Sequence, residues 1–179
     1  MSGQSNSRQD LGANGAAVPE TSSHARTLAK LVRGKNIHEE TLLATDYLNH
    51  FNEVIMLIGM ISDMPECLED AKDWEPKSYE EHFRDSAFAD KDLAILAYEN
   101  APPRFRIPFD NTVSQMNGMV AAGVLRIEAA LGEGNPEKVT DLVQNISRNL
   151  QRLVDTASAI IHGAERAMDQ TEIDTMLDS

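Results

Sequence analysis

The chain has 179 residues, enough for one domain with tails, and its aromatic content of 5% alongside 8 methionines favours helix packing over sheets. Its formal net charge is −13, so its surface should repel phosphate backbones and anionic lipid head groups, which excludes nucleic acid and membrane surfaces as expected partners. Cys67 is the only cysteine and the first residues contain no apolar run, so we expect a cytoplasmic protein without disulfides.

Residues 1–22 are rich in Ser, Gly, Asn, Gln and Ala. Such a segment cannot bury enough apolar surface to offset the entropy lost on ordering, which predicts a disordered leader. A short helix should follow, with Ser23 as its cap and with Leu28, Leu31 and Val32 on one face. Gly34 is expected to end it.

A long helix is predicted over residues 37–62. Its apolar residues recur every three or four positions, the period of one face of a helix, and no proline interrupts the segment. The face consists of Leu43, Tyr47, Phe51, Val54, Ile58 and Ile61.

Residues 63–103 form an acidic insert in which we expect short helices near 66–73, 78–85 and 89–99. Pro65 fits the first turn of the first helix. Ser78 and Asp90 are plausible N-terminal caps of the second and third helices. The Ala-Pro-Pro sequence at 101–103 should break the chain.

Two long helices are predicted at 108–131 and 136–168, joined by a Gly-Glu-Gly-Asn turn. Pro136 suits the first position of the second helix. Helices joined by so short a loop form an antiparallel hairpin. The predicted fold is therefore all-α: a helical hairpin within a three- or four-helix bundle over residues 23–168. Whether the chain forms a homodimer stays open.

Two histidine–carboxylate groupings raise the possibility of a metal site. Asp46, His50 and Glu53 share one face of the predicted 37–62 helix, and His162 and Glu165 repeat the His-x-x-Glu spacing. Di-iron bundles place such side chains on facing helices. Their usual signature is Glu-x-x-His, which this chain lacks, so an amphipathic helix edge is the competing interpretation and no cofactor is predicted.

The last eleven residues, 169–179, predict a separate amphipathic helix. Asp169 and Glu172 have the spacing of a capping box. Ile173, Met176 and Leu177 then fall on one face, with acidic residues on the others. Such a helix is a suitable ligand for a hydrophobic groove bordered by lysine or arginine.

This tail resembles the C-terminal peptide of the CheZ family of chemotaxis phosphatases, which binds the response regulator CheY. A similar string opens several flagellar switch proteins. The residues that match the family pattern identically or conservatively are Gln170, Ile173, Asp174, Met176, Leu177, Asp178 and Ser179. The resemblance implies that the tail binds a CheY-like receiver, and the family's helical-hairpin body agrees with the fold predicted here.

Catalysis in that family depends on a glutamine four residues after an aspartate, and this chain has no Asp-x-x-x-Gln. The nearest combinations are Asn111 with Gln115, and Asp110 with Gln115 at one residue too many. We therefore expect a non-enzymatic protein-interaction module that binds a CheY-like receiver or a flagellar switch component. The alternatives are a receiver phosphatase using Asp110, Asn111 and Gln115, and a metal-binding bundle.

Overall fold

The computed structural model describes residues 23–164 of the chain, and every regular element within this range is helical. The predicted all-α fold is thus confirmed for these residues. The predicted leader at 1–22 and the predicted tail helix at 169–179 lie outside the described residues. The elements are α1 (Ser23–Leu31), η1 (Thr45–Leu48), α2 (Asn49–Met60), α3 (Cys67–Asp73), α4 (Tyr79–Asp85), α5 (Lys91–Glu99), α6 (Pro103–Gly132) and α7 (Pro136–Ile161).

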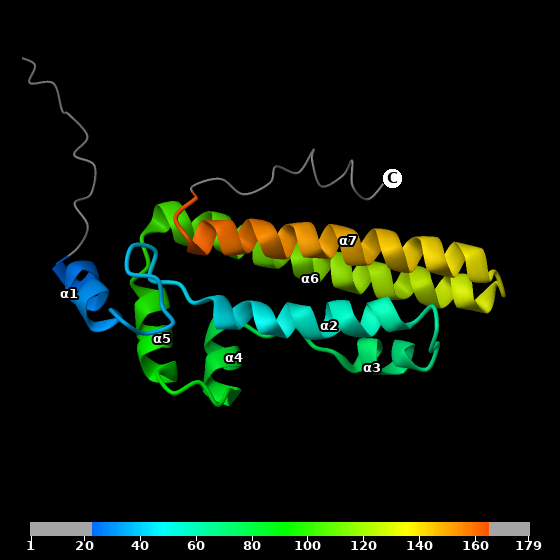
Figure 1. Cartoon of the computed structure of the whole chain (residues 1–179), viewed down its shortest axis with the longest axis horizontal. Coiled ribbons are helices and arrows are strands. Elements are labelled where there is room, and N and C mark those ends of the chain that lie inside the picture. Colours follow the sequence, from blue (N-terminus) through cyan, green and yellow to red (C-terminus); the bar gives the residue numbers. More distant parts are fainter. Residues whose placement is uncertain (1–22, 165–179) are drawn as a thin grey trace, which may run out of the picture.

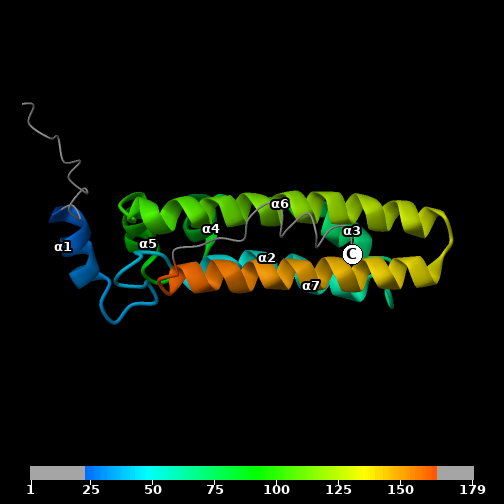
Figure 2. The ribbon, with the colours of Figure 1, turned by 90° about the horizontal axis from the view of Figure 1, so that it is seen from above.

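Helices α6 and α7 form the predicted antiparallel hairpin and run side by side along the length of the molecule (Figures 1 and 2). The turn follows local rules, because Gly134 has a φ of 67° and the Asn135 side chain accepts a hydrogen bond from the Lys138 N–H at 3.1 Å. Gly123 lets the two helices approach closely, since a Cβ there would lie 2.9 Å from Cγ2 of Ile146.

Helix α6 begins at Pro103, five residues before the predicted start at Pro108. A proline inside a helix removes one hydrogen bond and is normally unfavourable. Here Phe105 and Phe109 lie on either side of Pro108 in the sequence, and both are buried in the core. Burial of two aromatic side chains offsets the proline, because each contributes more than one lost hydrogen bond costs.

The predicted helix over 37–62 is wrong in its first half. Regular α-helix begins only at Asn49, after η1, and an irregular segment, residues 32–44, precedes both. Leu42 has a φ of 60°, which no α-helix accommodates, and Thr41 donates from Oγ1 to the Ile161 carbonyl at 2.7 Å. The apolar periodicity reported burial correctly, since Leu42 and Leu43 are buried, but the backbone is a loop packed against the end of α7.

Helix α2 lies along the hairpin and completes the bundle core with Phe51, Val54 and Ile58, all fully buried (Figure 1). Helix α3 covers one end of α2, while α4 and α5 stand across the bundle axis at the other end. None of the helices within residues 23–164 is long and apolar enough to cross a membrane.

The short helices of the acidic insert occur close to their predicted positions. Ser78 caps α4 as predicted, in a reciprocal capping box: the Glu81 N–H donates to the Ser78 hydroxyl at 3.2 Å and the Ser78 N–H donates to the Glu81 carboxylate at 2.8 Å. Asp90 precedes α5 but makes no capping hydrogen bond. Its carboxylate accepts instead from Lys35 at 2.8 Å, which ties the irregular segment to α5.

One side chain of α1 and the end of α7 differ from prediction. Leu28 and Val32 are buried and Gly34 has a φ of 75°, as expected for α1, but the Leu31 side chain is 55% exposed and lies off the buried face. Helix α7 ends at Ile161 rather than near residue 168, because Gly163 adopts a φ of 108° that turns the chain out of the helix.

Candidate binding cleft beside helix α6

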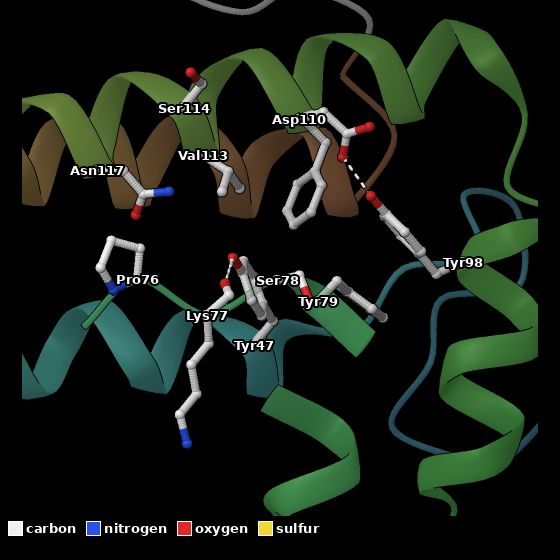
Figure 3. Close-up of a pocket in the computed structure, with 11 residues that line it drawn as sticks. Tyr47, Pro76, Lys77, Ser78, Tyr79, Tyr98, Asp110, Val113, Ser114 and Asn117 are labelled. Carbon is white, nitrogen blue, oxygen red and sulfur yellow. Dashed lines mark hydrogen bonds between the residues drawn. The ribbon is translucent and has the colours of Figure 1, made fainter. Parts of the chain in front are cut away.

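A cleft of about 370 Å³ opens between α6, α5, η1 and the short linker between α3 and α4 (Figure 3). Tyr79, the first residue of α4, also lines it, so five segments between positions 47 and 117 contribute. Its walls are aromatic and apolar at the base and polar along α6. The residues that line it are Tyr47, Pro76, Lys77, Ser78, Tyr79, Tyr98, Phe109, Asp110, Val113, Ser114 and Asn117.

The base of the cleft is a rigid group of aromatic rings. Tyr79 and Tyr98 stack with centroids 4.3 Å apart, and Tyr47 and Phe109 are almost fully buried beside them. The Tyr47 hydroxyl donates to the Lys77 carbonyl at 2.7 Å, and the Tyr79 hydroxyl accepts from the Ala44 N–H at 2.9 Å. Burial raises the pKa of Tyr98 to about 12 and that of Tyr47 and Tyr79 still further, so these phenols stay neutral at physiological pH.

Asp110 lies at the α5 end of the cleft. Its Oδ1 accepts a hydrogen bond from the Tyr98 hydroxyl at 2.8 Å, and its Oδ2 lies 3.6 Å from Nε of Arg106, one helical turn earlier. The Arg106 guanidinium also stands over the Tyr98 ring, 4.7 Å from its centroid. The carboxylate and the tyrosine thus already bind one guanidinium at the edge of the cleft.

Asn117 continues the polar side of the cleft along α6, whereas Ser114 lies at its rim with its hydroxyl pointing away from it (Figure 3). Asn117 follows Asp110 by seven residues, a spacing that shares a helix face. The Oδ1 atom of Asn117 is buried and has no hydrogen-bond partner within the described residues. An unpaired buried acceptor is costly, so this side chain would gain from a donor.

The three phosphatase candidates do not meet at this cleft. Asp110 lines it, whereas Asn111 is exposed and Gln115 is absent from its walls. Asp110 and Gln115 are five residues apart and therefore face different directions on α6. Asn111 and Gln115 do share a face, and the Oε1 atom of Gln115 is buried without a partner among the described residues.

The proposed metal ligands are likewise separated. His50 stacks on Trp74 with centroids 4.6 Å apart, and its Nε2 lies 2.9 Å from the Glu75 carbonyl. His162 is exposed, and its Nδ1 lies 2.7 Å from the Ser158 carbonyl. Glu53 is exposed on α2 and Glu165 lies outside the described residues. Within residues 23–164 no three histidine, cysteine or carboxylate side chains could share a metal ion, so Asp46, His50, Glu53 and His162 form no ligand set.

His50 instead belongs to an aromatic cluster that holds the linker against α2. The Trp74 indole N–H donates to the His50 carbonyl at 3.1 Å, and the His82 ring lies 6.1 Å from the His50 ring. Burial lowers the pKa of both histidines. The aromatic residues of the acidic insert were the one sequence signal for this cluster and for the cleft, but they gave no indication of which partners they would contact.

A second polar surface, which sequence analysis missed, lies between α7 and the start of α2. Gln151 and Asp155 occupy one face of α7, and the glutamine amide donates to the Asp155 carboxylate at 3.1 Å. They line a groove of about 300 Å³ together with Asn49 and Asn52 of α2. The two residues are four positions apart, as in Asp-x-x-x-Gln, but here the glutamine precedes the aspartate.

Comparison of the chain with protein-family models, with curated proteins and with solved structures gives no match. The residues predicted to bind a partner, Gln170, Ile173, Asp174, Met176, Leu177 and Asp178, lie outside the described residues.

Proposed function

We propose that the chain is a protein-interaction module whose C-terminal segment binds a CheY-like receiver domain or a flagellar switch component. The observation that carries this proposal is the sequence of residues 169–179, which combines a capping-box spacing, a three-residue apolar face and a match to the CheZ tail pattern. The partner surface that fits it is an apolar groove bordered by basic side chains.

Three features of the protein support this proposal. The α6–α7 hairpin is the type of scaffold that the resemblance implies. Helix α7 also ends at Ile161, before the segment begins, so binding by the segment does not require the hairpin to unfold. The net charge of −13 would draw the module toward a basic groove and speed the encounter.

Truncation of the segment tests the proposal. We expect a phosphorylated CheY-like receiver to bind the full chain with micromolar affinity, since three buried apolar residues contribute about 1.5–3 kcal/mol each before the costs of ordering. A chain ending at Met168 should lose this binding. Leu177→Ala should weaken it, whereas Thr175→Ala, on the other side of the predicted helix, should not. Equal binding by the full and truncated chains would show that the proposal is wrong.

Dephosphorylation of the same receiver is a second candidate function, favoured by the Gln151–Asp155 contact on α7. In the CheZ family a glutamine near an aspartate positions the water that attacks the phospho-aspartate. Gln151 is exposed, and its side-chain amide donates to the Asp155 carboxylate at 3.1 Å.

The lifetime of the phosphorylated receiver distinguishes the two functions. If the module is an enzyme, the full chain should shorten this lifetime and Gln151→Ala should abolish the effect without changing affinity. Gln144→Ala, two turns earlier on α7, is the matched control. An unchanged lifetime with the intact chain would leave binding as the function and exclude the phosphatase.

A further inference from the structure

We propose that helix α2 binds a basic amphipathic helix of a protein partner through an exposed methionine stripe, Met56, Met60 and Met64. The stripe belongs to the bundle and is separate from both the C-terminal segment and the cleft beside α6. Its continuity along α2, its exposure and the charge at its borders lead to this assignment.

The three methionines follow one another at intervals of one helical turn. Met56 and Met60 are four residues apart on α2, a spacing that places two side chains on one face of a helix. The Met64 N–H donates to the Met60 carbonyl at 2.8 Å, which is the hydrogen-bond pattern of an α-helix, so the turn after α2 continues this face. The stripe therefore runs without a break along the half of α2 next to α3 (Figure 1).

This part of α2 is apolar on its exposed side as well as on its buried side. Residues 54–62 contain no charged side chain, whereas the exposed face of a surface helix is normally polar. Met56 is 58% and Met64 is 42% exposed, and Met60 packs only partly against the core. Contiguous exposed apolar surface of this kind is typical of protein interaction sites.

The shape of the stripe suits a partner helix. Side chains four residues apart form the ridge that packs into the groove of a second helix. A Cβ on Gly59 would have no atom within 4 Å, so the backbone beside the ridge is open to a close approach. Methionine is flexible and polarizable, and it adapts to the apolar side chains that such a helix presents.

The borders of the stripe are acidic. Glu53 precedes Met56 by three residues, and Asp63 and Glu66 lie on either side of Met64 in the sequence; all three acidic residues are exposed. None of them forms an ion pair with another residue of the described part of the chain. Residues 36–71 contain no lysine or arginine, so these negative charges have no basic neighbour along this stretch of the sequence.

The charge of the borders distinguishes among possible occupants. A second copy of the chain would place its own acidic borders against these, and the C-terminal segment would bring Asp174 and Asp178. Both arrangements are opposed by repulsion between like charges. A helix with an apolar face bordered by lysine or arginine is attracted instead, and the geometry therefore favours this partner.

Peptides of defined pattern test the proposal on the full chain, with the methionine methyl groups labelled for NMR. We expect an amidated peptide of two Leu-Lys-Lys-Leu-Leu-Lys-Leu repeats to shift the signals of Met56, Met60 and Met64. The signals of Met116 and Met119, which are buried in α6, should stay unchanged. A peptide of the same composition without an apolar face, and a peptide with glutamate in place of lysine, should each bind at least about ten-fold more weakly.

Substitutions at exposed positions separate the apolar contact from the charge. Met56→Gln should weaken binding of the basic peptide about ten-fold, whereas Leu125→Gln removes a similarly exposed side chain from α6 and should change nothing. Glu53→Gln should weaken binding about two- to three-fold and reduce its dependence on salt. Glu99→Gln, on α5 at the other end of the bundle, is the matched control (Figure 1). Far-ultraviolet circular dichroism verifies that each variant is folded.

The proposal is overturned if the two peptides of leucine and lysine bind alike, or if Leu125→Gln weakens binding as much as Met56→Gln does. Shifts confined to Met168 and Met176 would place the peptide on the C-terminal segment and would also overturn it. Sedimentation velocity tests the remaining occupant, because a dimer that Met56→Gln converts to a monomer would show that the stripe joins two copies of the chain. Receiver binding by residues 169–179 is tested by truncation and does not depend on these outcomes.

Discussion

Individual side chains in this protein link segments that are distant in the sequence. The Thr41 hydroxyl donates a hydrogen bond to the Ile161 carbonyl in the last turn of α7. The Tyr79 hydroxyl accepts a hydrogen bond from the Ala44 N–H of the irregular segment. His50 joins α2 to the linker through the Glu75 carbonyl and through its stacking on Trp74. Burial of the His50 ring favours its neutral form and so lowers its pKa.

The histidine cluster predicts that the protein loses stability as the pH falls below about 6.5. Burial lowers the pKa of His50 and His82 below the ordinary value of 6.5, so on acidification the unfolded chain takes up these protons first. The free energy of unfolding, measured with denaturant, should therefore be lower at pH 5.5 than at pH 7.5. The lowered pKa values of Glu81 and Asp85 keep those carboxylates ionised throughout this window.

Substitution of one histidine tests this assignment. His50→Gln keeps a donor for the Glu75 carbonyl but cannot titrate, so the difference in stability between the two pH values should shrink. His24→Gln alters an exposed histidine of α1 and should leave the difference unchanged. A pH dependence that is identical in both variants and in the unmodified chain would contradict the role of His50.

At the level of elements, the α6–α7 hairpin contributes the largest share of the buried residues. Leu150, Leu153 and Ile160 of α7 are completely buried in the hydrophobic core. The outer face of α6 carries no charge from Asn111 to Leu125, and Leu125 there is 66% exposed. Position on the helix, more than residue type, thus decides what each leucine contributes.

A matched pair of leucines tests this contrast. Leu150→Ala should lower the free energy of unfolding by about 2–5 kcal/mol, because it leaves a cavity in the core. Leu125→Ala removes the same atoms from an exposed site and should change it by less than about 0.5 kcal/mol. Denaturant unfolding measures both, and similar small effects would show that the α7 seam is misassigned.

Across the whole molecule, ion pairs connect the elements but contribute little stability. Lys72 of α3 reaches Glu128 of α6 at 2.8 Å, and Arg104 of α6 reaches Glu40 of the irregular segment at 3.2 Å. All four side chains are substantially exposed, and such pairs typically contribute about 0–1 kcal/mol. Cohesion therefore comes from the shared apolar core.

The helical class, the hairpin and the short helices of the acidic insert could all be predicted from the amino-acid sequence. Its signals were caps, prolines, glycines and apolar periodicity, which act over a few residues: the Ser78 capping box and the turn at Gly134 and Asn135 depend on no distant partner. The backbone of residues 32–44 could not be predicted, because apolar periodicity indicates which side chains are buried and not the path of the chain. Leu42 adopts a φ of 60° next to Thr41, whose hydroxyl donates a hydrogen bond to the carbonyl of Ile161, 120 residues away in the sequence. The cleft likewise depends on the tertiary structure, since Tyr47, Tyr98 and Asp110 come together only when α5 and η1 pack against α6.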